Sequence, residues 1–298
     1  MKIGIDLGGS HIGIGVIDKE GKVVEKQETD LNTAIISNIP QFIEEYVLKT
    51  IANIVDKYSI DFIGIASPGT PREGKITTLV NLGIRELDIT GMIKQYYDLP
   101  VQVRNDAKCA GIAEKTFGSL KKYQDAVFLC LGSGIGGSAF LSRKELKPMR
   151  NPGLEIGHMV INKDGRLCNC GKRGCFETYC SMKRLKNELM EEMNLDKTIS
   201  SQELLKQLEK RKKEPIVANI LEEYIENLIV GLSNVIDIFE PQAICLGGGF
   251  VYFEKVLYEM LVENYYAKRY VFNKQTMPDL KLAALGNDAG MIGATIKE

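Results

Sequence analysis

The 298-residue sequence predicts an α/β protein that folds as two lobes. Single hydrophobic cores stop growing near about 250 to 300 residues, so a chain of this length favours two domains. Near its start and again from residue 125, the chain repeats one pattern, in which an apolar strand leads through a glycine turn into a second apolar strand. When the second copy is aligned with the first at an offset of 124 residues, Leu7 aligns with Leu131, Gly8 with Gly132, and Gly13 with Gly137. This likeness suggests a weak internal duplication.

The first half of the chain reads as strands followed by helices. Alternating apolar residues and turn residues predict a β-meander with strands at 1–9, 10–21 and 22–30. Helical periodicity follows at about 38–58, then come a strand at 62–67, a Pro-Gly loop, and a short strand at 101–104 that runs into a helix at about 106–117. The junction between this strand and this helix falls at Asn105 and Asp106.

The second half repeats the meander and then becomes mainly helical. The segment from about 181 to 240 has helical periodicity, with an apolar helix near 216–239 and a charged stretch at 203–215 that is expected to face solvent. The strand at 243–250 contains a third glycine turn, and three such turns could converge on one ligand. A last strand at 280–285 precedes a terminal helix whose small residues predict close packing.

Composition narrows the class of protein. Lys plus Arg number 38 against 39 Asp plus Glu, so no basic surface for nucleic acid is expected. The chain opens without a leader-like segment and no run approaches about 18 apolar residues, which predicts a cytosolic protein that does not span a membrane. Seven cysteines in a reducing compartment favour metal binding over disulfides. Four of them lack ligand spacing and are expected in the core: Cys109, Cys130, Cys180 and Cys245.

One of the chain's two histidines precedes a Cys-x-Cys-x4-Cys cluster by ten residues. Three thiols and one imidazole are the soft ligands that tetrahedral zinc prefers, and the glycines of this segment would let it wrap the ion. The sequence therefore predicts a structural zinc site whose four ligands all come from the protein: His158, Cys168, Cys170 and Cys175. The alternative is that these are reduced thiols packed as small apolar groups. Glu155 and Glu177 flank the loop and could bind a polyhydroxyl ligand.

Glycine turns bear on function because backbone N–H groups can converge on anionic oxygens where no side chain blocks the approach. Phosphate is the natural ligand for such a turn. Asp6 lies just before the first turn, where it could hold magnesium against the phosphates of a nucleotide, directly or through water. The second copy has Cys130 at that position, so only the first lobe carries this acid. Each turn taken alone is weak evidence for a ligand, because ordinary hairpin turns also use glycine routinely.

Four motifs together resemble the ROK family of sugar kinases, in the actin-like ATPase superfamily, over essentially the whole chain. IGIDLGGSHIGIGVID resembles the first phosphate motif, LCLGSGIGGSAFL the second, NPGLEIGH with CNCGKRGCFE the signature and zinc segment, and ICLGGGF the adenosine-side turn. The resemblance implies two ribonuclease-H-like lobes with a cleft between them, ATP held mainly by the C-terminal lobe, and a hexose deep in the cleft. The implied lobes are 1–117 with the terminal helix 287–298, and 118–286.

The resemblance also implies roles for single residues. Asp106 matches the catalytic base that takes the proton from the sugar hydroxyl, although its position alone is also that of a helix cap. A carboxylate in a helix's first turn is favoured in its ionised form, which weakens it as a base. One ring nitrogen of His158 would bind zinc while the other faces the sugar. Sugar-contacting positions are matched by Asn81, Asn105, Asp106, Glu155, His158 and Glu177. Nucleotide-site positions are matched by Asp6, Gly8, Gly9, Ser10, Gly132, Ser133, Gly134, Gly136, Gly248 and Gly249.

The implied activity is ATP-dependent phosphorylation of a hexose hydroxyl, expected at the 6-OH, with Mg²⁺ and structural Zn²⁺ as cofactors and a homodimer as the assembly. Departures from the family pattern leave the acceptor open among glucose, fructose, mannose, allose and N-acylated hexosamines: Ser10-His11, Ile84, Lys108, Ser138 and Leu154. A sugar-sensing regulator without transfer activity is the alternative. Because the first strand begins at Lys2 or Ile3, a repressor would need a separate partner to contact DNA. The account requires Asp106 in one lobe to meet Glu155 and His158 of the other.

Overall fold

The computed structural model describes residues 1–8, 11–31, 35, 38–79, 84–147, 154–267 and 277–297. It divides into two compact units. Unit 1 comprises Met1–Lys122, Lys147–Leu154 and Ala284–Glu298, and unit 2 comprises Tyr123–Leu146 and Glu155–Ala283. Three of the predicted site residues, Gly9, Ser10 and Asn81, lie outside the described residues.

Unit 1 is built on a five-stranded mixed sheet. Its strands are β1 (Lys2–Leu7), β2 (His11–Ile17), β3 (Val23–Asp30), β4 (Ile63–Ser67) and β8 (Val101–Asn105). They lie in the order β3-β2-β1-β4-β8. The first three strands form the predicted antiparallel meander, whereas β1, β4 and β8 run parallel. The carboxyl ends of these three parallel strands therefore lie at the same edge of the sheet, which is where open α/β sheets bind ligands.

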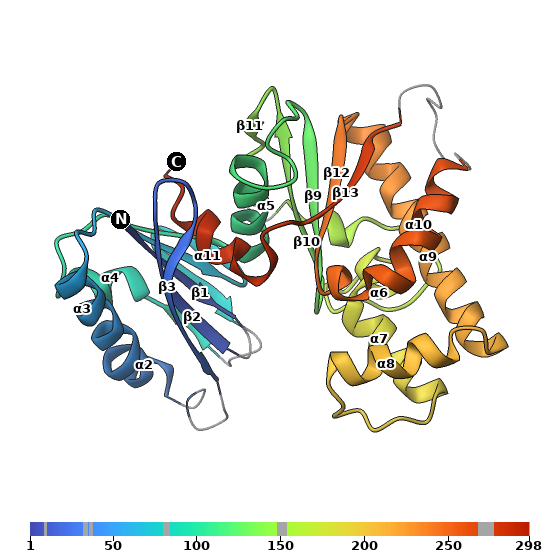
Figure 1. Cartoon of the computed structure of the whole chain (residues 1–298), viewed down its shortest axis with the longest axis horizontal. Helices are drawn as coiled ribbons and strands as arrows, with labels where there is room; N and C mark the ends of the chain where they lie inside the picture. Colours follow the sequence, from blue (N-terminus) through green and yellow to red (C-terminus); the bar gives the residue numbers. More distant parts are fainter. Residues whose placement is uncertain are drawn as a thin grey trace. The chain divides into compact units, whose positions relative to one another are not determined.

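Helices cover both faces of this sheet (Figure 1). The helix expected at 38–58 runs as α2 (Ile39–Phe42), a π-helical turn (Ile43–Val47) and α3 (Leu48–Lys57). Together with α4 (Ile89–Lys94), it buries the isoleucines that alternate along β1 and β4. On the other face lie α5 (Asp106–Thr116) and α11 (Ala289–Ala294), which contact each other and β4.

The terminal helix α11 packs against its neighbours at backbone distance. A Cβ atom on Gly64 of β4 would lie 1.9 Å from the carbonyl oxygen of Ala294, and one on Gly293 would lie 1.7 Å from that of Cys109. Only glycine allows so close an approach. The close packing predicted from the small residues of this helix is confirmed.

Unit 2 contains a second sheet of the same topology. Its strands are β9 (Ala126–Leu131), β10 (Ile135–Leu141), β11 (Lys144–Glu145), β12 (Ala243–Gly248) and β13 (Asp279–Leu282). The order β11-β10-β9-β12-β13 again joins a three-stranded antiparallel meander to two parallel strands. The internal duplication suggested by the two glycine turns thus extends to the whole sheet.

The uniform offset of 124 residues is wrong beyond the first strand of each copy. In unit 1 Leu7 pairs with Ile12 across the turn, but in unit 2 Leu131 pairs with Ile135, so the second turn is one residue shorter. Gly13 lies opposite Asp6, and Gly136 lies opposite Cys130. Gly13 therefore corresponds to Gly136 and not to Gly137.

A small three-stranded sheet replaces part of the loop that the sequence predicted after β4. It consists of β5 (Thr70–Arg72), β6 (Lys75–Leu79) and β7 (Ile84–Leu87). The first hairpin turns at Glu73 and Gly74, which both have positive φ, as tight two-residue turns require. These strands are short and largely polar, so they lack the apolar alternation from which strands are predicted.

Helices make up most of the remainder of unit 2. They include α6 (Glu177–Cys180), α7 (Met182–Glu192), α8 (Ser201–Arg211), α9 (Pro215–Phe239) and α10 (Glu254–Tyr266). The charged stretch forms α8 and the turn after it, where Lys212 and Lys213 face solvent as expected. The helix α10 was not predicted. Within the described ranges, no helix combines the length and apolar character that crossing a bilayer requires.

One fully buried carboxylate holds the chain next to two of the four places where it passes between the units. Glu114 of α5 accepts the backbone N–H of Ser119 at 2.8 Å through Oε2, and those of Ala284 and Leu285 at 2.8 Å each through Oε1. Ser119 lies just before the crossing at residues 122–123, and Ala284 directly follows the crossing at 283–284. The carboxylate therefore satisfies three backbone donors near two of these connections.

Replacing Glu114 should destabilise the protein strongly. Glu114→Ala leaves three N–H groups without their acceptor and is expected to cost on the order of 3 kcal/mol, whereas Glu114→Gln keeps one acceptor oxygen and should cost less. Urea unfolding followed by circular dichroism measures both. Equal midpoints for wild type and Glu114→Ala would show that the carboxylate is dispensable.

Candidate active site and metal centre

The four predicted zinc ligands come together in unit 2. The imidazole and thiol ligand atoms of His158, Cys168, Cys170 and Cys175 all lie within 4.8 Å of one another. The Sγ of Cys168 is 3.6 Å from Nδ1 of His158, and the Sγ atoms of Cys170 and Cys175 are 3.6 Å apart. Residues separated by up to 17 positions thus form one compact donor set.

Local turns bring the ligands together. Gly171 has a φ of +88° and its N–H bonds to the Cys168 carbonyl at 2.9 Å, which closes the turn between the first two cysteines. Gly174 has a φ of +76°, and a Cβ on it would lie 1.5 Å from the Asn162 carbonyl oxygen. Lys172 donates to the His158 carbonyl at 2.7 Å and so ties the cysteine end of the loop to its histidine end.

Three sulfurs and one nitrogen in this arrangement fit a structural zinc ion, with every coordination position supplied by protein. The alternative of packed apolar thiols fits Cys168 and Cys175, which are buried, but not the exposed Cys170. Burial raises the pKa of the Cys175 thiol to about 12, whereas the backbone N–H of Lys172 lowers the pKa of Cys170. Of the four remaining cysteines, three are buried as expected, and Cys130 is half-buried.

The two ring nitrogens of His158 face different residues. Its Nδ1 faces the Cys168 sulfur, and its Nε2 lies 3.9 Å from Oε2 of Glu155. A metal-binding histidine commonly offers its second nitrogen to a carboxylate or another acceptor. Glu155 is therefore well placed to hold the ring, while part of its own surface remains exposed.

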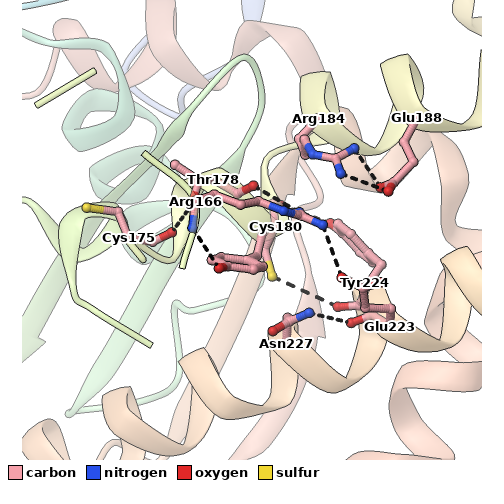
Figure 2. Close-up of polar contacts among 10 residues, drawn as sticks. Arg166, Cys175, Thr178, Cys180, Arg184, Glu188, Glu223, Tyr224 and Asn227 are labelled. Atoms are coloured by element: carbon pink, nitrogen blue, oxygen red, sulfur yellow. Dashed lines mark hydrogen bonds and ion pairs between the residues drawn. The ribbon is translucent and has the colours of Figure 1, made fainter. Parts of the chain in front are cut away.

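A polar network that the sequence did not predict supports the loop (Figure 2). Arg166 stacks on Tyr179 with its guanidinium 4.5 Å from the ring centroid, and it donates to the Thr178 carbonyl at 3.2 Å. It also pairs with Glu223 of α9 at 3.1 Å. The Thr178 hydroxyl donates to the carbonyl of Cys175 at 2.7 Å. This network fastens the metal loop to helices α6 and α9.

Two of the glycine turns lie together in unit 2. The turn at residues 132–134 joins β9 to β10, and Gly248 at the end of β12 pairs with Leu131, directly before that turn. Gly248 has a φ of +69°, which favours glycine. Ser133 and Gly248 are exposed, as a binding turn requires. Gly136 lies in β10, beyond the turn.

In unit 1, predicted site residues gather at the carboxyl edge of the parallel strands. Asp6 lies opposite Ala66 near the ends of β1 and β4, and Ser67 lies opposite Asn105 at the end of β8. Asn105 is the N-cap of α5, because its Oδ1 accepts the Lys108 N–H at 3.2 Å, while its Nδ2 donates to the Gly69 carbonyl at 3.1 Å. The cap interpretation of Asp106 is therefore wrong.

Asp106 is instead the first residue of α5, and its Oδ1 accepts the N–H of Ala107 at 2.7 Å. Burial raises the pKa of this carboxyl, and the backbone N–H bonds only partly oppose that effect. The helix was expected to weaken Asp106 as a base by favouring its ionised form. Desolvation has the larger effect here, and it raises the pKa of the carboxyl and so strengthens it as a base.

Asp6 lies in an acidic environment. Burial, followed by the charge of Asp106, raises the pKa of Asp6 to about 7. Glu28 and Asp288 raise it further and Lys26 lowers it; Lys26 itself bridges Glu28 and Asp288 at 2.6 Å each. The sequence did not predict these three residues, although Lys26 and Glu28 alternate along β3 and so share one face of the sheet. A partly buried acid among other acids is a natural site for a divalent cation.

The ROK family model matches residues 2–296, so the chain belongs to the ROK family. The chain is similar to the xylose repressor of Bacillus subtilis, with 29% identity over 250 residues, 82% of this chain and 63% of the repressor, so it spans less than two thirds of that protein. It is also similar to the glucokinase of Streptomyces coelicolor, with 26% identity over 313 residues, 99% of this chain and 96% of the glucokinase.

The fold agrees with solved members of the family. A ROK family glucokinase from Streptomyces griseus in complex with glucose and AMPPNP matches with a TM-score of 0.78 and 23% identity, covering 99% of this chain and 97% of that chain. The predicted α/β fold of the actin-like ATPase type is confirmed. The site residues predicted for the two halves lie in different units, and their meeting across a cleft stays a prediction.

Loss of one thiolate should weaken metal binding. Cys170→Ser is expected to lower bound zinc well below one equivalent and to lower the melting temperature by several degrees, because structural zinc contributes on the order of 10 kcal/mol to such loops. Elemental analysis and calorimetry measure both. Asp164→Asn, an exposed change in the same loop, is the control. Full metal content in Cys170→Ser would remove that sulfur from the ligand set.

The raised pKa of Asp6 predicts a pH dependence of stability in the absence of divalent cations. The folded protein holds this proton up to about pH 7, whereas the unfolded chain releases it near the ordinary pKa of 3.8. The bound proton therefore contributes to the free energy of unfolding. This contribution is complete below pH 3.8 and is lost as pH rises through about 7. Relative to Asp6→Asn, wild type should lose on the order of 2 kcal/mol between pH 4 and 7.5. Parallel curves for the two proteins would contradict this.

Proposed function

We propose that the protein transfers the γ-phosphoryl group of ATP to a hexose hydroxyl, the 6-OH, with Asp106 as general base. The observation that carries this proposal is the pairing of two partly buried carboxylates, Asp6 and Asp106, at the carboxyl edge of β1 and β8. Carboxyls with raised pKa values are typical of catalytic acids and bases, and the charge of Asp106 is one cause of the raised pKa of Asp6. Membership of the ROK family supports the class of reaction.

In the proposed reaction Asp106 accepts the proton of the attacking hydroxyl. Its Oδ1 is held by the Ala107 N–H, which leaves Oδ2 for the sugar. The sugar oxygen forms a bond to the γ-phosphorus while the bond from that phosphorus to the β-phosphate oxygen breaks, and ADP leaves. Because phosphoryl transfer has a loose transition state, alignment of the hydroxyl contributes more than the strength of the base.

Asp6 would hold magnesium, directly or through water. Its carboxylate oxygens and its acidic surroundings fit a hard divalent cation, which would neutralise charge on the ATP phosphates when bound. The glycine turns at residues 132–134 and 248–249 would bind the nucleotide. The solved glucokinase that holds AMPPNP supports ATP as the donor.

The sugar would be held by carboxylates and amides around the metal loop and the start of α5. Glu155 and Glu177 offer acceptors for sugar hydroxyls, and Nε2 of His158 offers one N–H donor when Nδ1 binds the metal. Asn105 has an amide that is already oriented by Lys108 and Gly69, so it would bind the sugar without a change of rotamer. The structural zinc would order this loop. Asn81 is proposed as a further contact from its sequence position.

Asp106→Asn should separate binding from turnover. The amide preserves size and hydrogen bonding but cannot accept the proton, so sugar affinity should stay within a few fold while kcat falls by at least about 100-fold. In wild type, kcat/KM should decline as pH falls through the raised pKa of Asp106. Asp56→Asn, an exposed change on α3, serves as control. An active, folded Asp106→Asn protein would exclude this role.

A sugar-sensing regulator is the second candidate, favoured by the likeness to a xylose repressor. Retention of both Asp6 and Asp106 favours the enzyme. A coupled ADP-release screen over aldoses, ketoses and N-acetylhexosamines separates the two and identifies the acceptor. Tight sugar binding in calorimetry without ADP release from any sugar would favour the regulator. The division into two lobes around a shared cleft and a homodimeric assembly belong to the same proposal.

A further inference from the structure

Both ends of the metal loop contact the same residue of the second glycine turn. Glu177, two residues after the last cysteine ligand, accepts the backbone N–H of Ile135 through Oε2 at 2.9 Å. At the other end of the loop, Gly157 directly precedes His158, and a Cβ on it would lie 2.2 Å from the Ile135 carbonyl oxygen. The two arms of the metal loop thus contact the peptide groups on both sides of Ile135, one through a hydrogen bond and the other by close packing.

Ile135 is the residue at which the glycine turn ends and β10 begins. It pairs with Leu131 across the turn, and the N–H of Gly132 bonds to the carbonyl of Gly134 at 2.9 Å. A side chain on Gly134 would displace the Glu177 carboxylate, because a Cβ there would lie 2.3 Å from Oε2 of Glu177. Beyond the loop, the N–H of Lys183 bonds to the Gly132 carbonyl at 3.1 Å. The turn is therefore fixed by the segment that the metal orders.

We propose that Glu177 is a positioning residue for the nucleotide, through which the metal loop sets the conformation of the turn at 132–134. The inference rests on the proposed function, since it takes this turn as a phosphate site. A glycine-rich turn loses much conformational entropy when it binds, so a turn that is already held in place binds more tightly. Nucleotide affinity should consequently depend on the metal and on Glu177 even when no sugar is present.

The proposal extends the role of Glu177 beyond sugar binding. One carboxylate oxygen is committed to the Ile135 N–H, and the other is the atom that the proposed sugar contact would use. A single side chain would then connect the hexose to the turn beneath the phosphates. Sugar binding would in this way bear directly on the geometry of the nucleotide site.

Three substitutions of Glu177 separate hydrogen bonding from charge. Glu177→Gln keeps an oxygen that can accept from Ile135 but removes the charge, Glu177→Asp keeps the charge but is too short to reach, and Glu177→Ala lacks both. Titration calorimetry with a non-hydrolysable ATP analogue and Mg²⁺, without sugar, should give wild-type affinity for Gln and an affinity about tenfold lower for Asp and Ala. Zinc content and melting temperature identify any variant that has lost its fold.

Glu223→Ala is the matched control, because this carboxylate also supports the metal loop, through Arg166 (Figure 2), whereas the hydrogen bond to the turn comes from Glu177. It should bind the analogue as wild type does. Wild-type protein stripped of metal by a chelator should lose about tenfold in affinity and regain it when zinc is restored.

Folded, zinc-loaded Glu177→Asp and Glu177→Ala that bind the analogue as tightly as wild type would overturn the inference and leave the proposed function intact. A metal-stripped wild type with unchanged affinity would also overturn it. Absence of analogue binding by wild type itself would contradict the proposed function together with this inference.

Discussion

Three sulfur atoms and one imidazole nitrogen within 4.8 Å of one another are the constraint on which the candidate site of unit 2 depends. The loop that carries them has little core of its own, since Leu167 is 67% exposed and Cys170 is also exposed. A metal ion bound to such a set contributes an energy comparable to the net stability of a domain, about 5 to 15 kcal/mol. The loop in turn positions its neighbours: Glu155 lies beside His158, and Glu177 binds the glycine turn through the Ile135 N–H.

Unit 1 presents the opposite physical situation, because its site residues lie on regular, densely packed elements. Asp6 and Asp106 lie at the carboxyl ends of parallel strands, and glycines let α11 approach the same sheet at backbone distance. Partial burial of two acids near one another costs stability. Proteins commonly keep such destabilising buried acids at functional sites. Acidic side chains without a function in catalysis or binding usually lie exposed to solvent.

Much of this arrangement could be predicted from the sequence, because its signals are local. Ligand spacing identified the metal loop, and alternating apolar residues identified the strands of both meanders. The features that were missed depend on tertiary contacts. Asn105 rather than Asp106 caps α5, and desolvation raises the pKa of Asp106 more than the backbone N–H groups at the start of the helix lower it. The bonds from Glu177 to Ile135 and from Arg166 to Glu223 join residues 42 and 57 positions apart, and no sequence spacing indicates such pairs.

The central claim is that this chain is a phosphotransferase acting on a sugar hydroxyl. Phosphorus NMR of the zinc-loaded protein with Mg²⁺-ATP and a mixture of hexoses and N-acetylhexosamines tests it most directly. The account predicts a new sugar phosphomonoester signal that grows in step with ADP. An unchanged ATP spectrum, at sugar concentrations that saturate binding in calorimetry, would contradict the account.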